Sequence, residues 1–277
     1  MVGEMSIELP GAGALDYLPC RYGTSKLLFR GPRRRMEKPY LAFLGGNETY
    51  GKFVPLPFPA SVEQDIGRDC VNLGCQSAGL DSFVNDPEVL RIASSAEMTV
   101  LQVLGAQNLS NRFYRVHPRR NDRFLEPSPL LSAIYREVDF TEFSFNRHML
   151  GRLQMLSPDR FETVRDELQQ AWMSRMKLLL NAIDSATLLL WITFDDATDG
   201  GPDLGTEPVL VTQAMIDTLK DQVLGVVKVP VAPAGTSDDL GGMVYGQMDA
   251  PAAMRLPGPG AHDQIAECLT DALRAAL

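Results

Sequence analysis

The sequence has little of what builds metal sites, disulfide frameworks or membrane spans. It holds four cysteines and three histidines in 277 residues, and their spacing shows neither a CxxC pair nor a Cys/His zinc pattern. In a chain of this length such cysteines are expected to be reduced core thiols, so no metal, disulfide or other cofactor is predicted. The longest apolar runs, such as residues 187–194, are far shorter than the roughly 20 residues that cross a bilayer. No basic-then-apolar leader opens the sequence, which predicts a cytoplasmic protein without membrane contact.

Positive charge is also scarce. The 26 Lys and Arg residues stand against 35 Asp and Glu, a net charge of -9, which argues against binding to nucleic acid. Residues 1–150 hold 17 basic and 17 acidic side chains, so the acidic excess lies in residues 151–277. The basic side chains are concentrated in two runs, residues 30–35 and residues 115–123. Either run can be a solvated face, and the second can also belong to a binding site.

Hydrophobic runs alternate with helix-like patterns from Pro39 onward, which is typical of an α/β domain. Short apolar runs predict five buried strands, at residues 40–44, 70–73, 98–104, 187–194 and 225–229. Helical spacing of apolar residues, together with capping residues, predicts helices at residues 61–67, 87–96, 158–183, 212–223 and 261–277. The alternation predicts a three-layer α/β/α sandwich with a mostly parallel five-stranded sheet, a flavodoxin-like arrangement.

One domain is expected, because 277 residues with 45% hydrophobic side chains can bury one large core. Residues 1–38 show no sustained periodicity, so they are expected to form an arm that packs on a domain of residues 39–277. Two segments are predicted to be long loops, the polar residues 106–128 and the Gly- and Pro-rich residues 231–260. A connection as long as the first is usually functional or disordered, and here we favour function.

Three short segments lie at the ends of the first three predicted strands, and the carboxyl ends of parallel strands meet at one edge of a sheet. They are residues 43–51 (FLGGNETYG), 72–74 (NLG) and 105–108 (GAQN). In this order they resemble the sequence blocks of the SGNH (GDSL-type) hydrolase superfamily, whose first block reads F-L-G-D-S-x-T-x-G. The helix at residues 261–277 also resembles the one that ends that fold. The resemblance extends to a bacterial family of SGNH-like proteins with degenerate catalytic blocks, and it implies an SGNH-like fold without an established activity.

Two catalytic groups of the SGNH pattern are missing. Asn47 stands where the superfamily has its nucleophilic serine, and Gly46 stands where it has aspartate. Residues 249–256, ahead of the last helix, lack the Asp-x-x-His that supplies the base, and His262 aligns only with a second, supporting histidine. Because an amide nitrogen is a poor nucleophile, an acyl-enzyme at Asn47 is excluded.

The resemblance still implies an oxyanion-binding site. It places the side-chain amides of Asn47 and Asn108 and the backbone N–H of Gly74 around one oxygen atom, with Thr49 close by. We predict that these residues bind substrate. Two further residues of the polar segment, Arg119 and Arg120, are predicted to grip an anionic ligand through their guanidinium groups.

Two residues are candidates for a general base. His117 can reach over the site from the polar segment, or it can be a loop histidine bonded to backbone. Glu48 can activate a water molecule, or it can be an exposed or helix-capping carboxylate. Cys75 and Ser77 follow the second predicted strand, but neither has an evident catalytic partner.

Two functions follow from these residues. The first is an SGNH-like hydrolase or acyl-transferase that acts on an ester or carbohydrate substrate. The alternative is a catalytically inactive SGNH-like protein that binds an anionic sugar or metabolite, and a scaffold role is a third reading. The expected partner is a small-molecule or carbohydrate ligand, expected to be anionic, and the oligomeric state is left open.

Overall fold

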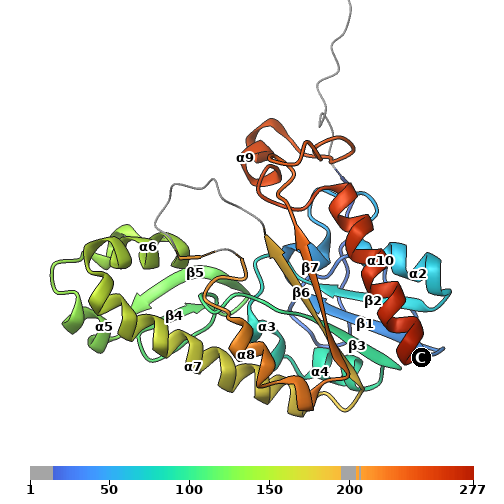
Figure 1. Cartoon of the computed structure of the whole chain (residues 1–277), viewed down its shortest axis with the longest axis horizontal. Helices are drawn as coiled ribbons and strands as arrows, with labels where there is room; N and C mark the ends of the chain where they lie inside the picture. The colour runs from blue at the N-terminus through green and yellow to red at the C-terminus, as the bar shows by residue number, and fades with distance from the viewer. Residues whose placement is uncertain (1–14, 195–203, 206) are drawn as a thin grey trace, which may run out of the picture.

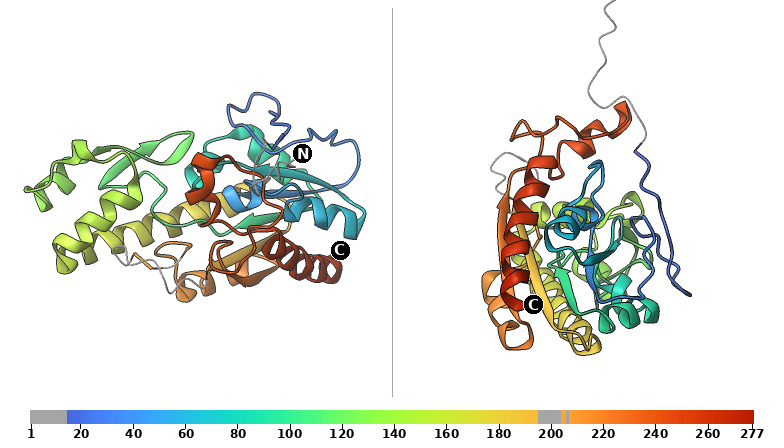
Figure 2. Two further views of the ribbon diagram at one scale, coloured as in Figure 1. Left: turned by 90° about the horizontal axis from the view of Figure 1, so that it is seen from above. Right: turned by 90° about the vertical axis from the view of Figure 1, so that its right-hand side faces the viewer.

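The computed structural model describes residues 15–194, 204–205 and 207–277. Its centre is a five-stranded sheet in the order β2-β1-β3-β6-β7, with every pair of neighbours parallel. The strands are β1 (Tyr40–Gly45), β2 (Asp69–Gly74), β3 (Met98–Gln102), β6 (Thr187–Phe194) and β7 (Gly225–Val231). Helices cover both faces of the sheet (Figures 1 and 2). The predicted three-layer α/β/α sandwich is confirmed.

Each face of the sheet has its own hydrophobic core. In β1, Ala42 and Leu44 point into one core, whereas Leu41 and Phe43 point into the other. Since neighbouring side chains of a strand point to opposite faces, a strand that is buried on both sides must be apolar at every position. All six residues of β1 are buried accordingly.

The helices divide between the two faces. Helices α2 (Phe58–Ile66) and α10 (Pro259–Ala276) cover one face, and their apolar residues join Leu41 and Phe43 in the smaller core. The other face carries α3 (Leu80–Val84), α4 (Pro87–Ser94), α7 (Pro158–Ala182) and α8 (Gln213–Asp217). Ser157 caps α7 by accepting a hydrogen bond from the Arg160 N–H, as the sequence predicted.

A lobe extends from the sheet at the left of Figure 1. It holds an antiparallel hairpin of β4 (Tyr114–His117) and β5 (Arg120–Pro127), followed by α5 (Pro129–Ile134), the 3-10 turn η1 (Phe140–Glu142) and α6 (Asn146–Leu156). The hairpin replaces most of the loop predicted for residues 106–128. The strand pattern was hidden because β4 is only four residues long and its register with β5 is irregular.

Part of the N-terminal segment packs against the rest of the chain. Tyr22, Leu27 and Phe29 are buried in the larger core. Arg30 is also buried, and its guanidinium group donates hydrogen bonds to the carbonyl oxygens of Tyr50, Gly51, Val54 and Pro55 at 2.9–3.3 Å. Desolvation lowers the pKa of Arg30, whereas Tyr50 and Tyr17 oppose that shift. The segment therefore braces the turn that follows β1.

The chain after β7 is more ordered than the loop expected at residues 231–260. It contains the 3-10 turn η3 (Gln247–Asp249) and the short helix α9 (Ala250–Ala253). Ala234, Met243 and Ala253 form a small third core with Phe53 and Val54. The Gly- and Pro-rich composition hid this packing, because it breaks up the periodicity that predicts elements.

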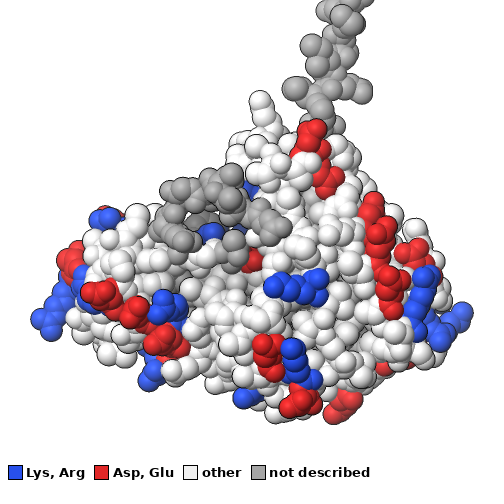
Figure 3. Space-filling view, viewed as in Figure 1, with Lys and Arg blue, Asp and Glu red and all other residues white. Residues whose placement is uncertain are grey.

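The acidic excess of residues 151–277 is visible on the surface of the protein. Asp and Glu side chains follow α10 on the face shown in Figure 3. Asp263, Glu267 and Asp271 are exposed there at a spacing of four residues, which places them on one side of the helix. In the part of the chain that the structure describes, no helix is long and apolar enough to cross a bilayer, and no cluster of His, Cys, Asp and Glu could hold a metal ion.

Candidate functional site

A cavity of about 140 Å³ opens at the carboxyl ends of β1, β3 and β6. The strand order places β2 on one side of β1 and β3 on the other. The connection from β1 to β2 and the connection from β2 to β3 therefore run in opposite directions along the sheet, and ligands of open α/β sheets bind where the direction reverses. The polar lining residues are Asn47, Glu48, Ser77, Gln102, Gln107, Asn108, Asp122 and Glu207. Leu104, Ile192 and Phe194 supply apolar wall. We call this the sheet-end cavity.

Gln102, the last residue of β3, fixes the geometry of the cavity floor. Its Oε1 accepts hydrogen bonds from the Gly46 N–H at 2.9 Å and from the Thr49 hydroxyl at 2.7 Å. With Oε1 occupied by two donors, the amide nitrogen must point the other way, and Nε2 donates to Oε2 of Glu48 at 2.8 Å. Glu48 is thereby held in one orientation.

Glu48 is a carboxyl group of this cavity whose pKa is raised. Burial raises its pKa, the hydrogen bond from Gln102 offsets part of that rise, and the nearby Glu207 carboxylate adds to it. Glu207 itself pairs with Arg147, at 2.6 Å, and accepts a hydrogen bond from the Val209 N–H. A carboxyl group with a raised pKa is a stronger base and holds a proton closer to neutral pH.

Asn47 and Asn108 lie in the same cavity, as predicted. The Asn47 Oδ1 accepts a hydrogen bond from the Ser77 N–H at 3.1 Å, and the Asn108 Oδ1 accepts one from the Asn146 Nδ2 at 3.1 Å. Both side-chain oxygens are thus used within the protein. The two amide NH2 groups have no partner among the residues that the structure describes, so they are available to a ligand oxygen.

Gly74 and Thr49 lie outside the lining of the sheet-end cavity. The Gly74 N–H donates to the Asn72 side chain at 2.8 Å, and a Cβ at this position would come within 2.3 Å of the Tyr50 nitrogen. Gly74 therefore serves the close packing of β2 on α1 (Asn47–Tyr50). Thr49 is only 1% exposed, and its hydroxyl donates a hydrogen bond to Gln102. In place of Gly74, the backbone N–H that reaches Asn47 belongs to Ser77.

The hairpin residues His117, Arg119 and Arg120 also lie outside the lining of the sheet-end cavity, and His117 is the backbone-bonded loop histidine that the sequence left as its alternative. The His117 Nδ1 accepts hydrogen bonds from the backbone N–H groups of Arg119 and Arg120, at 3.3 and 3.2 Å, and so closes the hairpin turn. Arg120 pairs with Asp122 at 3.6 Å. Arg119 lines a different cavity. The irregular hairpin register, which the sequence does not reveal, sets these positions.

The remaining two histidines lie outside the lining of the sheet-end cavity. His262 is fully buried at the start of α10, where its Nδ1 accepts a hydrogen bond from the Phe58 N–H at 3.1 Å and its ring stacks on Phe58. Desolvation, with a smaller effect from Arg30, lowers its pKa to about 3, so it stays neutral. His148 is exposed and contacts Phe143. No histidine lines the sheet-end cavity among the described residues.

Five lining residues were missed from the sequence: Ser77 as a backbone donor, Gln102, Gln107, Asp122 and Glu207. Gln107 is only 5% exposed, and its Oε1 has no hydrogen-bond partner within the described chain. The same holds for Oδ1 of Asp122. Gln102 and Gln107 flank the end of a predicted strand, which is a usable signal. No pattern in the sequence indicates that Asp122 and Glu207 lie at the carboxyl edge of the sheet.

The fold and this cavity define an α/β/α sandwich protein with a site of carboxyl and amide groups at the carboxyl edge of its sheet. The chain belongs to the family of the domain of unknown function DUF6473, whose model matches residues 5–277. A comparison with curated proteins finds no match.

Two solved structures are similar to the chain. One is a protein assigned to the G-D-S-L family of lipolytic proteins from Desulfitobacterium hafniense DCB-2, with 12% sequence identity and a TM-score of 0.43 over 84% of this chain and 99% of that one. The other is a two-domain esterase (CEX) active on acetylated mannans, with 12% identity and a TM-score of 0.41 over 86% of this chain. In that case the match spans 50% of the esterase.

Proposed function

We propose that the protein is a hydrolase that cleaves an ester of an uncharged, hydroxyl-rich substrate, with Glu48 as the general base for a water molecule. The observation that carries this proposal is the Glu48 carboxyl group, which has a raised pKa, is fixed by Gln102 and shares a cavity with the Asn47 and Asn108 amides. The proposal keeps the ester chemistry expected from the sequence and moves it from a serine nucleophile to water.

The chemistry balances without a covalent intermediate. Glu48 accepts a proton from water as the water oxygen attacks the ester carbonyl carbon. The negative charge that forms on the carbonyl oxygen is met by the NH2 groups of Asn47 and Asn108. When the intermediate breaks down, the leaving alkoxide takes the proton from Glu48, which releases an acid and an alcohol.

The lining of the cavity argues for a substrate with many donors. Glu48, Asp122 and Glu207 are carboxyl groups, Gln107 presents an unpaired oxygen, and no Lys or Arg lines the sheet-end cavity among the described residues. An anionic ligand would meet these acceptors unfavourably, whereas the hydroxyl groups of a sugar would satisfy them. We therefore propose a carbohydrate ester, and the anionic ligand expected from the sequence is not proposed for this cavity.

A binding protein without chemistry is the second candidate. It is favoured by the absence of a histidine from the described lining and by Asn47 at the position where a serine nucleophile was expected. Such a protein would hold a sugar through the same acceptors and leave it unchanged.

Hydrolysis assays on nitrophenyl acetate and on acetylated monosaccharides separate the two candidates. The hydrolase should turn over at least one acetylated sugar, and Glu48→Gln should lower kcat about 100-fold or more, since a general base contributes typically 10²–10⁴-fold. The binding protein should show no turnover, while free sugars raise its Tm and Asn108→Ala removes that effect. An Asp263→Asn variant, on the exposed side of α10, is a control that should match the wild type in both assays.

A further inference from the structure

A second cavity, of about 420 Å³, lies between the N-terminal segment and the β4–β5 hairpin. Thr24, Lys26 and Leu27 line it from the segment, and hairpin residues face them. None of its lining residues also lines the sheet-end cavity. We call it the hairpin cavity.

The basic run at residues 115–123 is divided by the hairpin. Arg120 pairs with Asp122, and Arg123 packs over the Phe145 ring at 4.9 Å. Only Arg115 and Arg119 line the hairpin cavity. The basic run is therefore not simply a solvated surface, because two of its four arginines line the hairpin cavity.

Lys26 and Arg119 supply two of the positive charges around the hairpin cavity. The side chains of Lys26 and Arg119 are exposed and have no acidic partner among the described residues. Arg115 contacts Glu126 at 3.1 Å, but both side chains are largely exposed, and such a pair is easily opened. Three positive groups therefore surround this hollow from two different parts of the chain.

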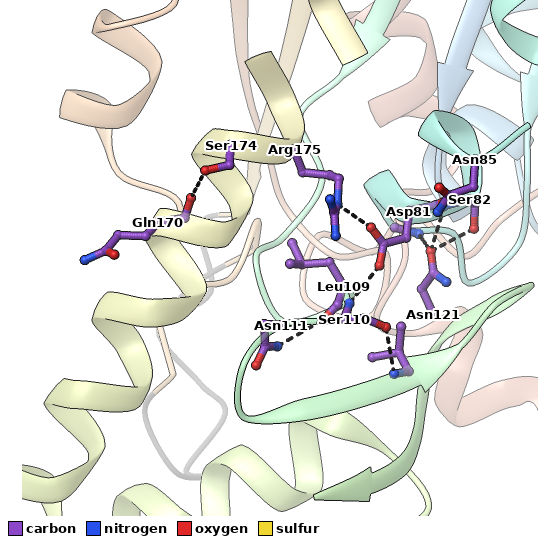
Figure 4. Close-up of polar contacts among 12 residues, drawn as sticks. Asp81, Ser82, Asn85, Leu109, Ser110, Asn111, Asn121, Gln170, Ser174 and Arg175 are labelled. Atoms are coloured by element: carbon purple, nitrogen blue, oxygen red, sulfur yellow. Dashed lines mark hydrogen bonds and ion pairs between the residues drawn. The ribbon is translucent and has the colours of Figure 1, made fainter. Parts of the chain in front are cut away.

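The two carboxylates in the lining have partners elsewhere in the chain. Asp81 pairs through Oδ1 with Arg175 of α7 at 2.6 Å and accepts a hydrogen bond from the Ser110 N–H at 2.7 Å through Oδ2 (Figure 4). Asp86 caps α4, and its other oxygen accepts a hydrogen bond from Ser25 at 2.6 Å. Each carboxylate therefore already has partners other than Lys26 and Arg119.

The floor of the hairpin cavity is tied together by hydrogen bonds and offers donors. The Asn121 Oδ1 accepts hydrogen bonds from the Gly79 N–H and from both the N–H and the hydroxyl of Ser82, which ties β5 to α3 (Figure 4). The Ser110 Oγ accepts a hydrogen bond from the Val116 N–H, so its own proton is free for a ligand. Thr24 supplies a second hydroxyl.

Apolar side chains complete the lining. Leu27, Val116, Pro118 and Leu125 lie beside the charged groups, and Leu125 is 51% exposed. An exposed leucine in a hollow ringed by polar groups loses its contact with water when an apolar ligand body covers it. The hairpin cavity thus combines a cationic rim with an apolar wall.

We propose that the hairpin cavity binds a small amphipathic anion, a carboxylate or a phosphate monoester on a short apolar body. Lys26 and Arg119 hold the anionic group from the two sides, the Ser110 and Thr24 hydroxyls donate to it, and the body lies on Leu125 and Val116. The site is independent of the proposed hydrolase activity.

Isothermal titration calorimetry with four probes tests this proposal. Hexanoate and hexyl phosphate carry both features, hexanol has the chain without the charge, and inorganic phosphate has the charge without the chain. We expect at least one of the first two to bind 10-fold or more tightly than the last two, and the stronger of the two shows which anionic group the cavity prefers. Raising the salt concentration should weaken that binding.

Variants place the binding in the hairpin cavity. Lys26→Ala combined with Arg119→Ala should weaken hexanoate or hexyl phosphate at least 10-fold, and Leu125→Ser should weaken the alkyl probes but not inorganic phosphate. Lys38→Ala combined with Lys177→Ala removes two exposed lysines outside the cavity and should change nothing. Equal binding of hexanol, unchanged binding in the Lys26/Arg119 double variant, or no binding of either amphipathic anion at millimolar concentration would overturn the proposal. Activity on acetylated sugars should be the same in all these variants.

Discussion

Gln102 donates a hydrogen bond from Nε2 to Oε2 of Glu48 at 2.8 Å, and it can do so only because its own oxygen is held by two other donors. The end of β3 thereby orients the first helical turn after β1. The carboxyl group proposed as the base is therefore positioned by the sheet itself, through one buried amide.

Replacing Gln102 should damage both stability and the site. Gln102→Leu leaves the Gly46 N–H and the Thr49 hydroxyl buried without an acceptor, which should lower the free energy of unfolding by about 2–4 kcal/mol. Urea unfolding followed by circular dichroism measures the loss. Gln264→Leu is the matched control, because Gln264 is exposed and its side chain donates to the Pro230 carbonyl, and this variant should cost less than about 0.5 kcal/mol. An equal loss in both variants would show that the Gln102 network contributes nothing special.

His262 should make stability depend on pH. Its folded-state pKa of about 3 lies below the usual 6.5, so in the window between these values the unfolded chain binds a proton that the folded chain does not. The free energy of unfolding should then fall as the pH is lowered from 6.5 toward 3, by up to about 1.4 kcal/mol per pH unit from this group. His262→Asn keeps an acceptor for the Phe58 N–H and should show a shallower fall in denaturant titrations at pH 4–7. Parallel curves for the two proteins would contradict the buried neutral histidine.

Ser77 should act through its backbone and not through its hydroxyl. It has a φ of 58°, in the left-handed region that favours glycine, so Ser77→Gly should stabilise the protein by about 0.5–1 kcal/mol while keeping the N–H that bonds to Asn47. Hydrolysis of acetylated sugars should stay within about threefold of the wild type. Loss of all turnover in a folded Ser77→Gly protein would instead make the Ser77 hydroxyl the nucleophile.

Arg30 should control the order of the turn after α1. Arg30→Met leaves four backbone carbonyls without their donor, and by analogy with broken buried charge contacts it should cost about 3–5 kcal/mol. Amide hydrogen exchange should become faster over residues 50–55. Arg35→Ala, at an exposed neighbouring arginine, is the control and should leave exchange unchanged. If amide hydrogen exchange over residues 50–55 is unchanged in Arg30→Met, the order of this turn does not depend on Arg30.

Much of the fold is visible in the sequence. The apolar run at residues 187–194 and the capped helix starting at Pro158 were placed correctly because burial on both faces and helical spacing leave strong periodic patterns. The β4–β5 hairpin was missed because β4 has only four residues and β5 is largely polar, and because the hairpin is held by contacts with α3, such as that of Asn121 with Ser82. Such contacts join residues far apart in sequence and leave no local pattern.

The site was predicted only in part, for a similar reason. Asn47, Glu48 and Asn108 follow strands, and parallel strands bring their ends together, so the sequence located them. Gly74 was chosen as the backbone donor, although the turn runs three residues further before Ser77 meets Asn47. Glu207 reaches the sheet-end cavity from a distant segment, and only the tertiary structure reveals its effect on Glu48.

The pH dependence of hydrolysis tests the central claim most directly. Glu48 must be ionised to accept a proton, so the wild-type kcat on an acetylated sugar should rise with pH through a pKa above 4.5, the usual value for this carboxyl group, and then level off. Glu48→Gln, which keeps an acceptor for Gln102, should retain no more than about 1% of the activity and should lose that rise. A Glu48→Gln protein with wild-type kcat and an unchanged pH profile would contradict Glu48 as the base.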